Sequence, residues 1–385
     1  MARAVFLLSL AAFASAASQR ATDPLLPQIA GDFGTTAGAA SAAVTAFALS
    51  YGLLQILVGP LGDRYGRYRT IAAAALVSAL GSAACAAAPS LDALVAARFI
   101  SGATIGAFIP LALAWIADTV AYERRQAVLA RFLVGQMLGL AFGTAAAGWF
   151  GEHFGWRSIF YALAALLLVI AVLLFLELRT QAPAGGGRGA MRESFRRMSS
   201  LLRQTRFRVL LATGFGEGLF ISGAFAFVAT YLQQRFAVGP GLAGSLVAMF
   251  AAGGIVYAVL ARRAVRRLGE GGLVALGGAA LVAGYAGLAL SGLVLLSALC
   301  VAAVGVGFYM LHTTVQMHVT HVAPENRGAA VALFATFLFL GQASGVWLAA
   351  RVVDGYGAAP VFVASAIGLA LLAAAFRYFL SSGGT

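Results

Sequence analysis

Residues 59–69 read Gly-Pro-Leu-Gly-Asp-Arg-Tyr-Gly-Arg-Tyr-Arg and join two long apolar stretches of the chain. Gly59 and Gly62 would allow neighbouring helix backbones to pack closely, because neither carries a side chain. Gly66 would permit a tight turn, since glycine adopts backbone conformations that other residues avoid. This stretch therefore predicts a very short connection between two closely packed helices.

The same connection is charged. Asp63 lies four residues before Arg67, which is the spacing of an ion pair on one face of a helix. Both side chains could also engage a neighbouring helix. Charged residues in a short loop between apolar stretches are typical of a protein that crosses a membrane several times.

The composition agrees with a membrane protein. The chain has 385 residues, of which 61% are hydrophobic and 10% are charged. A soluble domain averages about 45–50% apolar and about 25% charged residues. This sequence cannot cover a water-facing surface, which excludes an ordinary soluble enzyme, a disordered chain and a disulfide scaffold. Twelve spans of ~20 residues would account for roughly the hydrophobic fraction.

Apolar stretches about one span long recur along the chain. Residues 4–30 and 209–232 form two of them, and the uncharged stretch 271–324 is long enough for two spans with a turn near Ser291-Gly292. The count is twelve. Met1–Ser18 alone also has the features of a cleavable signal peptide. Cleavage there would leave an odd eleven spans, so we favour a retained first span.

The net charge of +13 is unevenly distributed. All 26 basic residues other than histidine are arginines, and 21 of them fall on one predicted side of the membrane. By the positive-inside rule, that side is the cytoplasm and contains both termini. The positive charge is then explained without nucleic acid. We expect a multi-pass protein of the bacterial inner membrane, surrounded by lipid.

The widest gap between spans divides the chain in two. Residues 178–208 form a basic linker, residues 1–177 an amino-terminal half of six spans, and residues 209–385 a carboxy-terminal half of six. Within the linker, 191–207 is either an amphipathic helix on the anionic inner leaflet or a solvated segment.

The two halves also share a pattern. Aligning Gly66 with Gly269 places a basic turn at the same point of each half. Two parallel six-span repeats are an architecture of transporters. The predicted fold is therefore an all-α membrane protein with twelve transmembrane helices in two pseudo-symmetric halves.

At this point the sequence resembles the major facilitator superfamily, whose signature loop reads Gly-x-x-x-Asp-Arg-x-Gly-Arg-Arg/Lys. The residues that match are Gly59, Asp63, Arg64, Gly66 and Arg67. Tyr68 departs from the pattern, since a basic residue is usual there. The resemblance implies that Asp118, at the end of the fourth span, pairs with this loop. The pair would be a charge latch that stabilises the outward-open state.

The fourth span carries a second motif of this family. It reads Arg98-x-x-x-Gly102-x-x-x-Gly106, and the resemblance links Arg98 to proton transfer. An arginine in lipid is costly and must face a partner or a wet cavity. In an alternative interpretation, Arg98 reaches the membrane surface from the end of the span.

The fifth span contains a ridge of glycines, Gly135, Gly139 and Gly143, on one helix face. Their spacing predicts close helix packing and resembles the antiporter motif of drug exporters. Leu140 stands where that motif has proline, which weakens the case for export. Segment 312–345 resembles the drug and sugar efflux branch of the family.

A few polar residues lie inside spans, where each is a functional candidate. Arg20 and Asp23 share a helix face and could pair, either in a site or merely at the outer rim. Glu217 falls near mid-membrane, ~13 Å along its span, and is the preferred proton carrier because desolvation disfavours its charged form. His312 and Gln316 share a face and could bind polar groups of a substrate.

These features predict a secondary active transporter, most simply a proton-coupled antiporter that exports a small amphipathic compound such as a drug or sugar. The alternative is a symporter that takes up a small organic anion through Arg20 and His312. The sequence has no Walker-type loop, so we expect no cofactor and the proton gradient as energy source. We expect a monomer with no metal site and no catalytic residues, because an intramembrane enzyme would need a nucleophile and base that no motif supplies.

Overall fold

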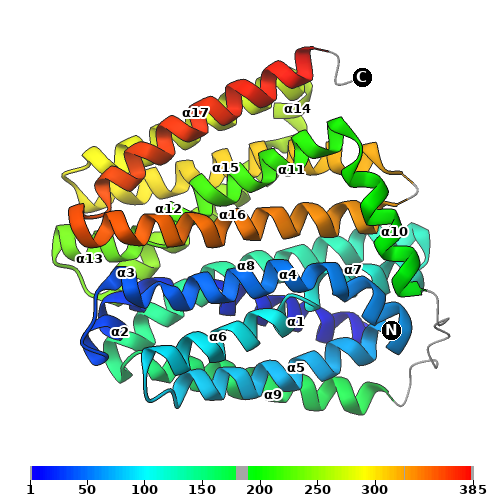
Figure 1. Ribbon diagram of the computed structural model, residues 1–385, viewed down its shortest axis with the longest axis horizontal. Coiled ribbons are helices and arrows are strands. Elements are labelled where there is room, and N and C mark those ends of the chain that lie inside the picture. Colours follow the sequence, from blue (N-terminus) through cyan, green and yellow to red (C-terminus); the bar gives the residue numbers. More distant parts are fainter. Residues whose placement is uncertain (1, 179–189, 325, 383–385) are drawn as a thin grey trace.

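The computed structural model describes residues 2–178, 190–324 and 326–382, and every regular element in these ranges is a helix. Figure 1 shows the helices running side by side across the molecule. The helices of the first half are α1 (Ala2–Arg20), α2 (Leu26–Asp32), α3 (Ala37–Ala40), α4 (Ala42–Tyr65), α5 (Arg67–Ala86), α6 (Leu91–Ile105), α7 (Phe108–Thr119), α8 (Tyr122–Phe154) and α9 (Arg157–Glu177). Those that follow are α10 (Ala190–Leu202), α11 (Thr205–Glu217), α12 (Gly223–Phe225), α13 (Val228–Phe236), α14 (Pro240–Leu290), α15 (Val294–Val322), α16 (Arg327–Tyr356) and α17 (Ala359–Ser381).

The described residues contain 11 helical segments that are long and apolar enough to cross a membrane. The longest of them, α14, has 51 residues and turns back at Gly269, whose φ of 62° lies outside the helical region. It therefore supplies two crossings, and the predicted twelve spans are all present. The predicted turn near Ser291 is also confirmed, because α14 ends at Leu290 and α15 begins at Val294.

Three of the crossings are broken inside the membrane. The first is interrupted by a short 3-10 helix, η1 (Asp23–Leu25), and the fourth is divided between α6 and α7. The seventh changes from α11 to a π-helix, η3 (Gly218–Ser222), directly after Glu217. Irregular backbone at membrane depth is tolerated where protein or a water-filled cavity surrounds it. The breaks in the first and seventh crossings thus place polar residues inside the protein.

The backbone dihedral angles show an internal repeat. Within the described residues, positive φ angles occur at six positions that form three pairs, each about 200 residues apart: Gly34 with Ala237, Gly66 with Gly269, and Gly155 with Gly357. The alignment of Gly66 with Gly269 predicted from the sequence is therefore one of three equivalent turns. Because the same turns recur in the same order, the two halves follow the same path.

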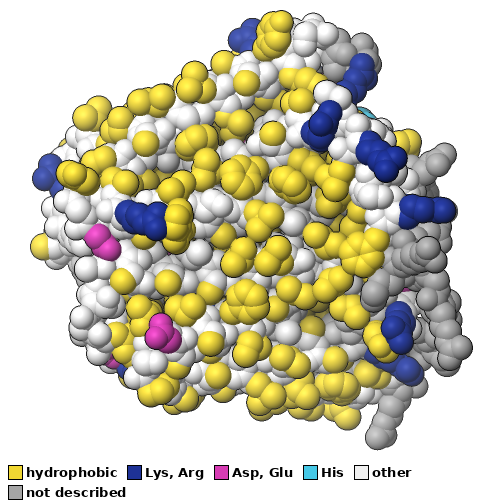
Figure 2. Space-filling model, in the orientation of Figure 1, with side chains coloured by type: hydrophobic (Ala, Val, Ile, Leu, Met, Phe, Trp, Pro, Cys, Tyr) yellow, Lys and Arg dark blue, Asp and Glu magenta, His cyan; other side chains and the backbone are white. Residues whose placement is uncertain are grey.

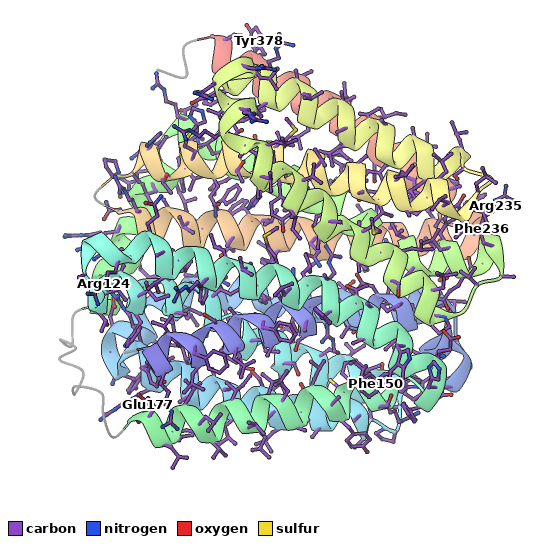
Figure 3. All side chains as sticks on the ribbon, turned by 180° about the vertical axis from the view of Figure 1, so that it is seen from behind. Arg124, Phe150, Glu177, Arg235, Phe236 and Tyr378 are labelled. Carbon is purple, nitrogen blue, oxygen red and sulfur yellow. The ribbon has the colours of Figure 1, made fainter. Side chains whose placement is uncertain are left out.

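The two ends of the helix bundle differ in charge. One end, the basic face, carries α10, the turns at Gly66 and Gly269, and both chain ends (Figure 1). Figure 2 shows dark-blue basic side chains gathered at this end and hydrophobic side chains over the flank between the ends. Figure 3 places Arg124 and Glu177 toward the basic face, and Arg235 and Phe236 toward the opposite face. An apolar flank between two polar ends is the surface that a lipid bilayer covers.

Helix α10 lies across the basic face in contact with both halves, since it packs against α4 and α16. Its residues Met198 and Leu201 are buried. The predicted segment 191–207 is therefore divided between α10, which ends at Leu202 and packs one side on protein, and the first residues of α11. The next crossing begins at Thr205, inside the predicted linker.

The halves meet along two seams, one between α8 and α14 and the other between α4 and α16. Glycines bring the backbones together at both seams. A side chain at Gly244 would lie 2.6 Å from the Thr144 carbonyl oxygen, and one at Gly52 would lie 2.9 Å from Phe339 Cβ. The seams therefore have no room for larger residues, and they hold the polar residues of the interior between them.

Candidate functional site

The amino-terminal half contains a buried ion pair. Arg20 ends α1, and Asp23 begins the 3-10 helix that follows, because Pro24 cannot continue the α-helical hydrogen bonding. Arg20 Nη1 donates to Asp23 Oδ2 at 3.2 Å. Arg20 is 8% exposed and Asp23 is fully buried. The predicted pair is thus present, and it is enclosed by protein.

Arg98 lies in the same interior. It is 2% exposed, so the alternative that it reaches the membrane surface is wrong. Its Nη1 donates to the Ser18 carbonyl oxygen at 3.1 Å, and its guanidinium carbon lies 4.0 Å from the centre of the Phe47 ring. Its other two nitrogens have no hydrogen-bond partner among the described residues. Two guanidinium groups therefore share this interior with one carboxylate, that of Asp23.

The carboxy-terminal half contains a second polar pair. Glu217 is fully buried, and its Oε2 lies 2.9 Å from Nδ1 of His312 on α15. The imidazole ring stacks on Phe308, with ring centres 4.9 Å apart. Glu217 Oε1 has no hydrogen-bond partner among the described residues. The carboxyl group therefore has one oxygen fixed by the imidazole and one oxygen available for a proton.

Sequence reasoning named both residues but did not pair them. Glu217 and His312 lie 95 residues apart, and no periodicity connects α11 with α15. The expected companion of His312, Gln316, lies one turn further toward the basic face and is exposed. The side chain of His312 itself is 15% exposed. Solvent exposure therefore falls from Gln316 to His312 and then to Glu217.

Aromatic side chains join the two polar clusters. The guanidinium carbon of Arg20 lies 5.0 Å from the centre of the Phe225 ring, which belongs to the other half. Phe225 packs against Phe250, which packs against Phe308, with ring centres 4.9 and 5.5 Å apart. Phe308 then stacks on His312. This line of rings connects the Arg20–Asp23 pair with the Glu217–His312 pair.

A small recess, with room for about one water molecule, lies beside this line of rings, between the two halves. Its walls include Arg20 and Thr144 from the first half and Phe225, Val247 and Phe250 from the second. The walls are largely apolar, with one guanidinium group.

The signature loop forms the expected charge cluster on the basic face. Arg67 Nη2 pairs with Asp63 Oδ1 at 3.2 Å, and Arg67 Nη1 pairs with Asp118 and donates to the Ala114 carbonyl oxygen at 2.7 Å. These residues all belong to the first half. Arg64 lies apart from this cluster, with its guanidinium carbon 5.0 Å from the centre of the Tyr65 ring.

The glycines of this loop differ from the prediction in one respect. Gly66 makes the turn, with a φ of 91°, and Gly62 packs against Leu111. At Gly59, by contrast, a side chain would meet no atom within 4 Å. The predicted close packing at Gly59 is therefore wrong, because the surface of α4 that carries it faces open space.

The glycine ridge of the fifth span packs within the first half. Gly135, Gly139 and Gly143 on α8 lie against the backbone of α1 at Ser9, Phe13 and Ala17. A side chain at Gly139 would lie 2.8 Å from Phe13 Cα. The ridge thus fixes α1, and with it Arg20 and Asp23, against α8.

The described residues contain no group of three or more His, Cys, Asp or Glu side chains that could hold a metal ion. The free thiols of Cys85 and Cys300 are both buried and are far apart in sequence. The buried charged side chains among the described residues are Arg20, Asp23, Arg98 and Glu217, the last of which is paired with His312.

The family profile described as Major Facilitator Superfamily matches residues 8–346. This chain belongs to that family. Its members are transporters rather than enzymes, in agreement with the sequence prediction.

Individual relatives agree on the family. The chain is 27% identical over 372 residues to "Inner membrane transport protein YdhP" of Escherichia coli O157:H7, covering 95% of this chain and 93% of that protein. It is 25% identical to "Uncharacterized MFS-type transporter YwfA" of Bacillus subtilis (strain 168), covering 68% of this chain and 64% of the relative. A shorter match, 29% identical over 40% of this chain and 30% of the relative, is to "Multidrug export protein EmrB" of Haemophilus influenzae (strain ATCC 51907 / DSM 11121 / KW20 / Rd).

Solved structures confirm the fold. The chain superposes on the nucleoside transporter NupG (D323A mutant) with a TM-score of 0.79, covering 97% of this chain and 99% of that one at 14% identity. At this identity, the likeness establishes the fold alone. The family profile, the relative YdhP and the apolar helices together show a multi-pass inner-membrane transporter of small molecules.

Proposed function

We propose that this transporter is a proton-coupled antiporter that exports a small amphipathic compound by rocker-switch alternating access. The observation that carries the proposal is the Glu217–His312 pair. A carboxyl group that is fully buried in the membrane interior is costly unless it has a function or a partner, and here one oxygen lacks a partner among the described residues.

The geometry supports proton exchange from one side. His312 lies between the buried carboxyl group and the more exposed Gln316, so a proton that enters from the basic face would reach the imidazole before Glu217. An imidazole is the side chain best suited to relay protons near neutral pH. We place the basic face in the cytoplasm, with both termini, because of its arginine content. In this conformation the pair would release its proton to the cytoplasm.

The cargo class follows from the side chains where the two halves meet. The Arg20 guanidinium group beside the Phe225 and Phe250 rings favours an amphipathic molecule, and the match to a protein named for multidrug export supports an efflux role. Proton binding at Glu217 would favour one access state and cargo binding the other, which couples their movements in opposite directions. The protein would act as a single chain without a cofactor.

A second candidate is uptake of an organic anion by symport. It is favoured by the excess positive charge near the recess, where Arg20 and Arg98 face the single carboxylate of Asp23. In that mechanism the anion would pair with Arg20 while the proton again travels on Glu217.

The test begins with a thermal-shift screen of purified protein against ethidium, benzoate and methyl thiogalactoside, since a bound ligand stabilises the folded state. A compound that raises the melting temperature is then followed in proteoliposomes with an imposed pH gradient. Antiport predicts accumulation of the compound on the acidic side, and symport predicts accumulation on the alkaline side.

Two variants make this assay specific. Glu217→Gln should abolish movement driven by the pH gradient. The matched control is Glu270→Gln, because Glu270 pairs with His318 of the same helix α15 at the same 2.9 Å but is exposed at the basic face. Gradient-driven transport that survives in Glu217→Gln would remove this residue from the mechanism.

A further inference from the structure

At the face opposite the basic face, two carboxylates each accept hydrogen bonds from the other half. Asp354, near the end of α16, accepts a hydrogen bond from the backbone N–H of Gly38 at 2.8 Å and another from the Thr36 hydroxyl at 2.7 Å. Glu152, near the end of α8, accepts one from the backbone N–H of Gly241 at 2.8 Å. Each half therefore supplies one acid and receives the other.

These contacts are equivalent under the internal repeat. Glu152 lies three residues before the positive-φ turn at Gly155, as Asp354 does before Gly357. Their partners, Gly38 and Gly241, each lie four residues after the paired turns at Gly34 and Ala237. The repeat thus makes the same hydrogen bond twice, once at each seam.

The glycine partners make room for the acids. A side chain at Gly38 would collide with the carboxyl group of Asp354, and one at Gly239, beside Gly241, would lie 2.8 Å from Glu152 Oε2. Backbone N–H groups at the start of a span have no helical partner of their own, so a carboxylate satisfies a donor that would otherwise bond only to water. Such charge-assisted hydrogen bonds are stronger than neutral ones.

We propose that Glu152 and Asp354 form a paired latch that holds the opposite face closed and so sets the balance between the two access states. The inference rests on the alternating-access motion of the proposed function. Because donor and acceptor belong to different halves, both bonds must break when the halves separate at this face. A group that stabilises only one of two states shifts the equilibrium by the full strength of its contact.

A third acid at this face behaves differently and provides a control. Asp32 accepts from Trp156 Nε1 at 2.8 Å and pairs with Arg157, and all three residues belong to the first half. Its contacts move as one body with that half. Removing its charge should therefore leave the balance between access states unchanged.

The test measures the separation of the halves directly. Spin labels are attached to cysteines at Ala87 and Leu290, which are exposed at the opposite face of the first and second halves. The buried Cys85 and Cys300 are first replaced by alanine. Pulsed electron–electron double resonance in nanodiscs, without cargo or a pH gradient, then gives the populations of short and long distances between the two labels.

The expected results are graded. Glu152→Ala and Asp354→Ala should each raise the ratio of open to closed populations about tenfold, the low end for hydrogen bonds to charged groups. The double variant should approach the product of the two effects, because the contacts lie at different seams. Glu152→Gln keeps an acceptor and should give a smaller shift, and Asp32→Asn should give none.

An unchanged distance distribution in Glu152→Ala and in Asp354→Ala would overturn the latch, as would an equal shift in Asp32→Asn. The single variants carry the test if the double variant does not fold. This measurement needs neither a pH gradient nor cargo, so its outcome does not depend on proton transfer at Glu217. Loss of coupling in Glu217→Gln with no latch effect overturns only the latch, and the reverse result overturns only the proton-coupling proposal.

Discussion

Replacing Gly139 with alanine tests the close contact between α1 and α8, which positions the buried Arg20–Asp23 pair. The new methyl group would lie 2.8 Å from Phe13 Cα and closer still to the carbonyl oxygen of the same residue. Because these are backbone atoms, no side-chain rotation can relieve the overlap. The two helices must separate, and the Arg20–Asp23 pair at the end of α1 must move with them.

The magnitude follows from two opposing effects. Alanine in place of glycine within a helix stabilises it by ~1 kcal/mol, while overpacking of a closed interface costs ~1–3 kcal/mol. A contact with backbone lies at the upper end of that range, so we expect a net loss of ~1–2 kcal/mol for Gly139→Ala. At Gly59 no atom lies within 4 Å, so only the stabilising effect remains there.

The assay is thermal unfolding of purified variants in one detergent. We expect the order of stability to be Gly59→Ala above wild type, then Gly135→Ala, then Gly139→Ala. The intermediate place of Gly135 reflects its looser contact, 3.1 Å from the Ser9 carbonyl oxygen. If Gly139→Ala proved as stable as Gly59→Ala, the glycine ridge would not be the close contact described above.

Three further variants test other contacts. Arg98→Met should be as stable as wild type or up to ~1 kcal/mol more stable, because the Ser18 carbonyl oxygen is the only hydrogen-bond acceptor of this buried charge among the described residues. Transport should nevertheless fall, and a large loss of stability in thermal unfolding would contradict this. Arg67→Ala should lower the free energy of unfolding by only ~1 kcal/mol, since its partners such as Asp118 are exposed. It should nevertheless slow transport in proteoliposomes, and an unchanged rate would show that the loop has no role in gating. Ala237→Gly should stabilise the protein by ~0.5 kcal/mol, because the residue has a φ of 52°, and a lower melting temperature would refute this.

The sequence predicted features that depend on local composition. The twelve crossings, the turn near Ser291 and the turn at Gly66 follow from apolar length and glycine placement, and all are present. The Arg20–Asp23 pair was also predictable, since its two members lie three residues apart. Spacing along one helix is sufficient for each of these.

Features that depend on how helices face one another were not predictable. Glu217 and His312 meet only because α11 and α15 turn particular faces together, and helix rotation leaves no local pattern. Burial of Arg98 and the open surroundings of Gly59 depend on neighbouring helices in the same way. The hydrogen bonds that Glu152 and Asp354 accept from the other half could not be predicted either, because they depend on the packing of the two halves at the seams.

The central claim is that Glu217 exchanges its proton for the cargo, and proton release on binding tests it most directly. A compound that raises the melting temperature is added to purified protein in a weakly buffered solution, and the released protons are counted with a pH indicator. We expect release from wild type and from Glu270→Gln, and none from Glu217→Gln when each protein is saturated. Equal proton release from Glu217→Gln and wild type would contradict the account.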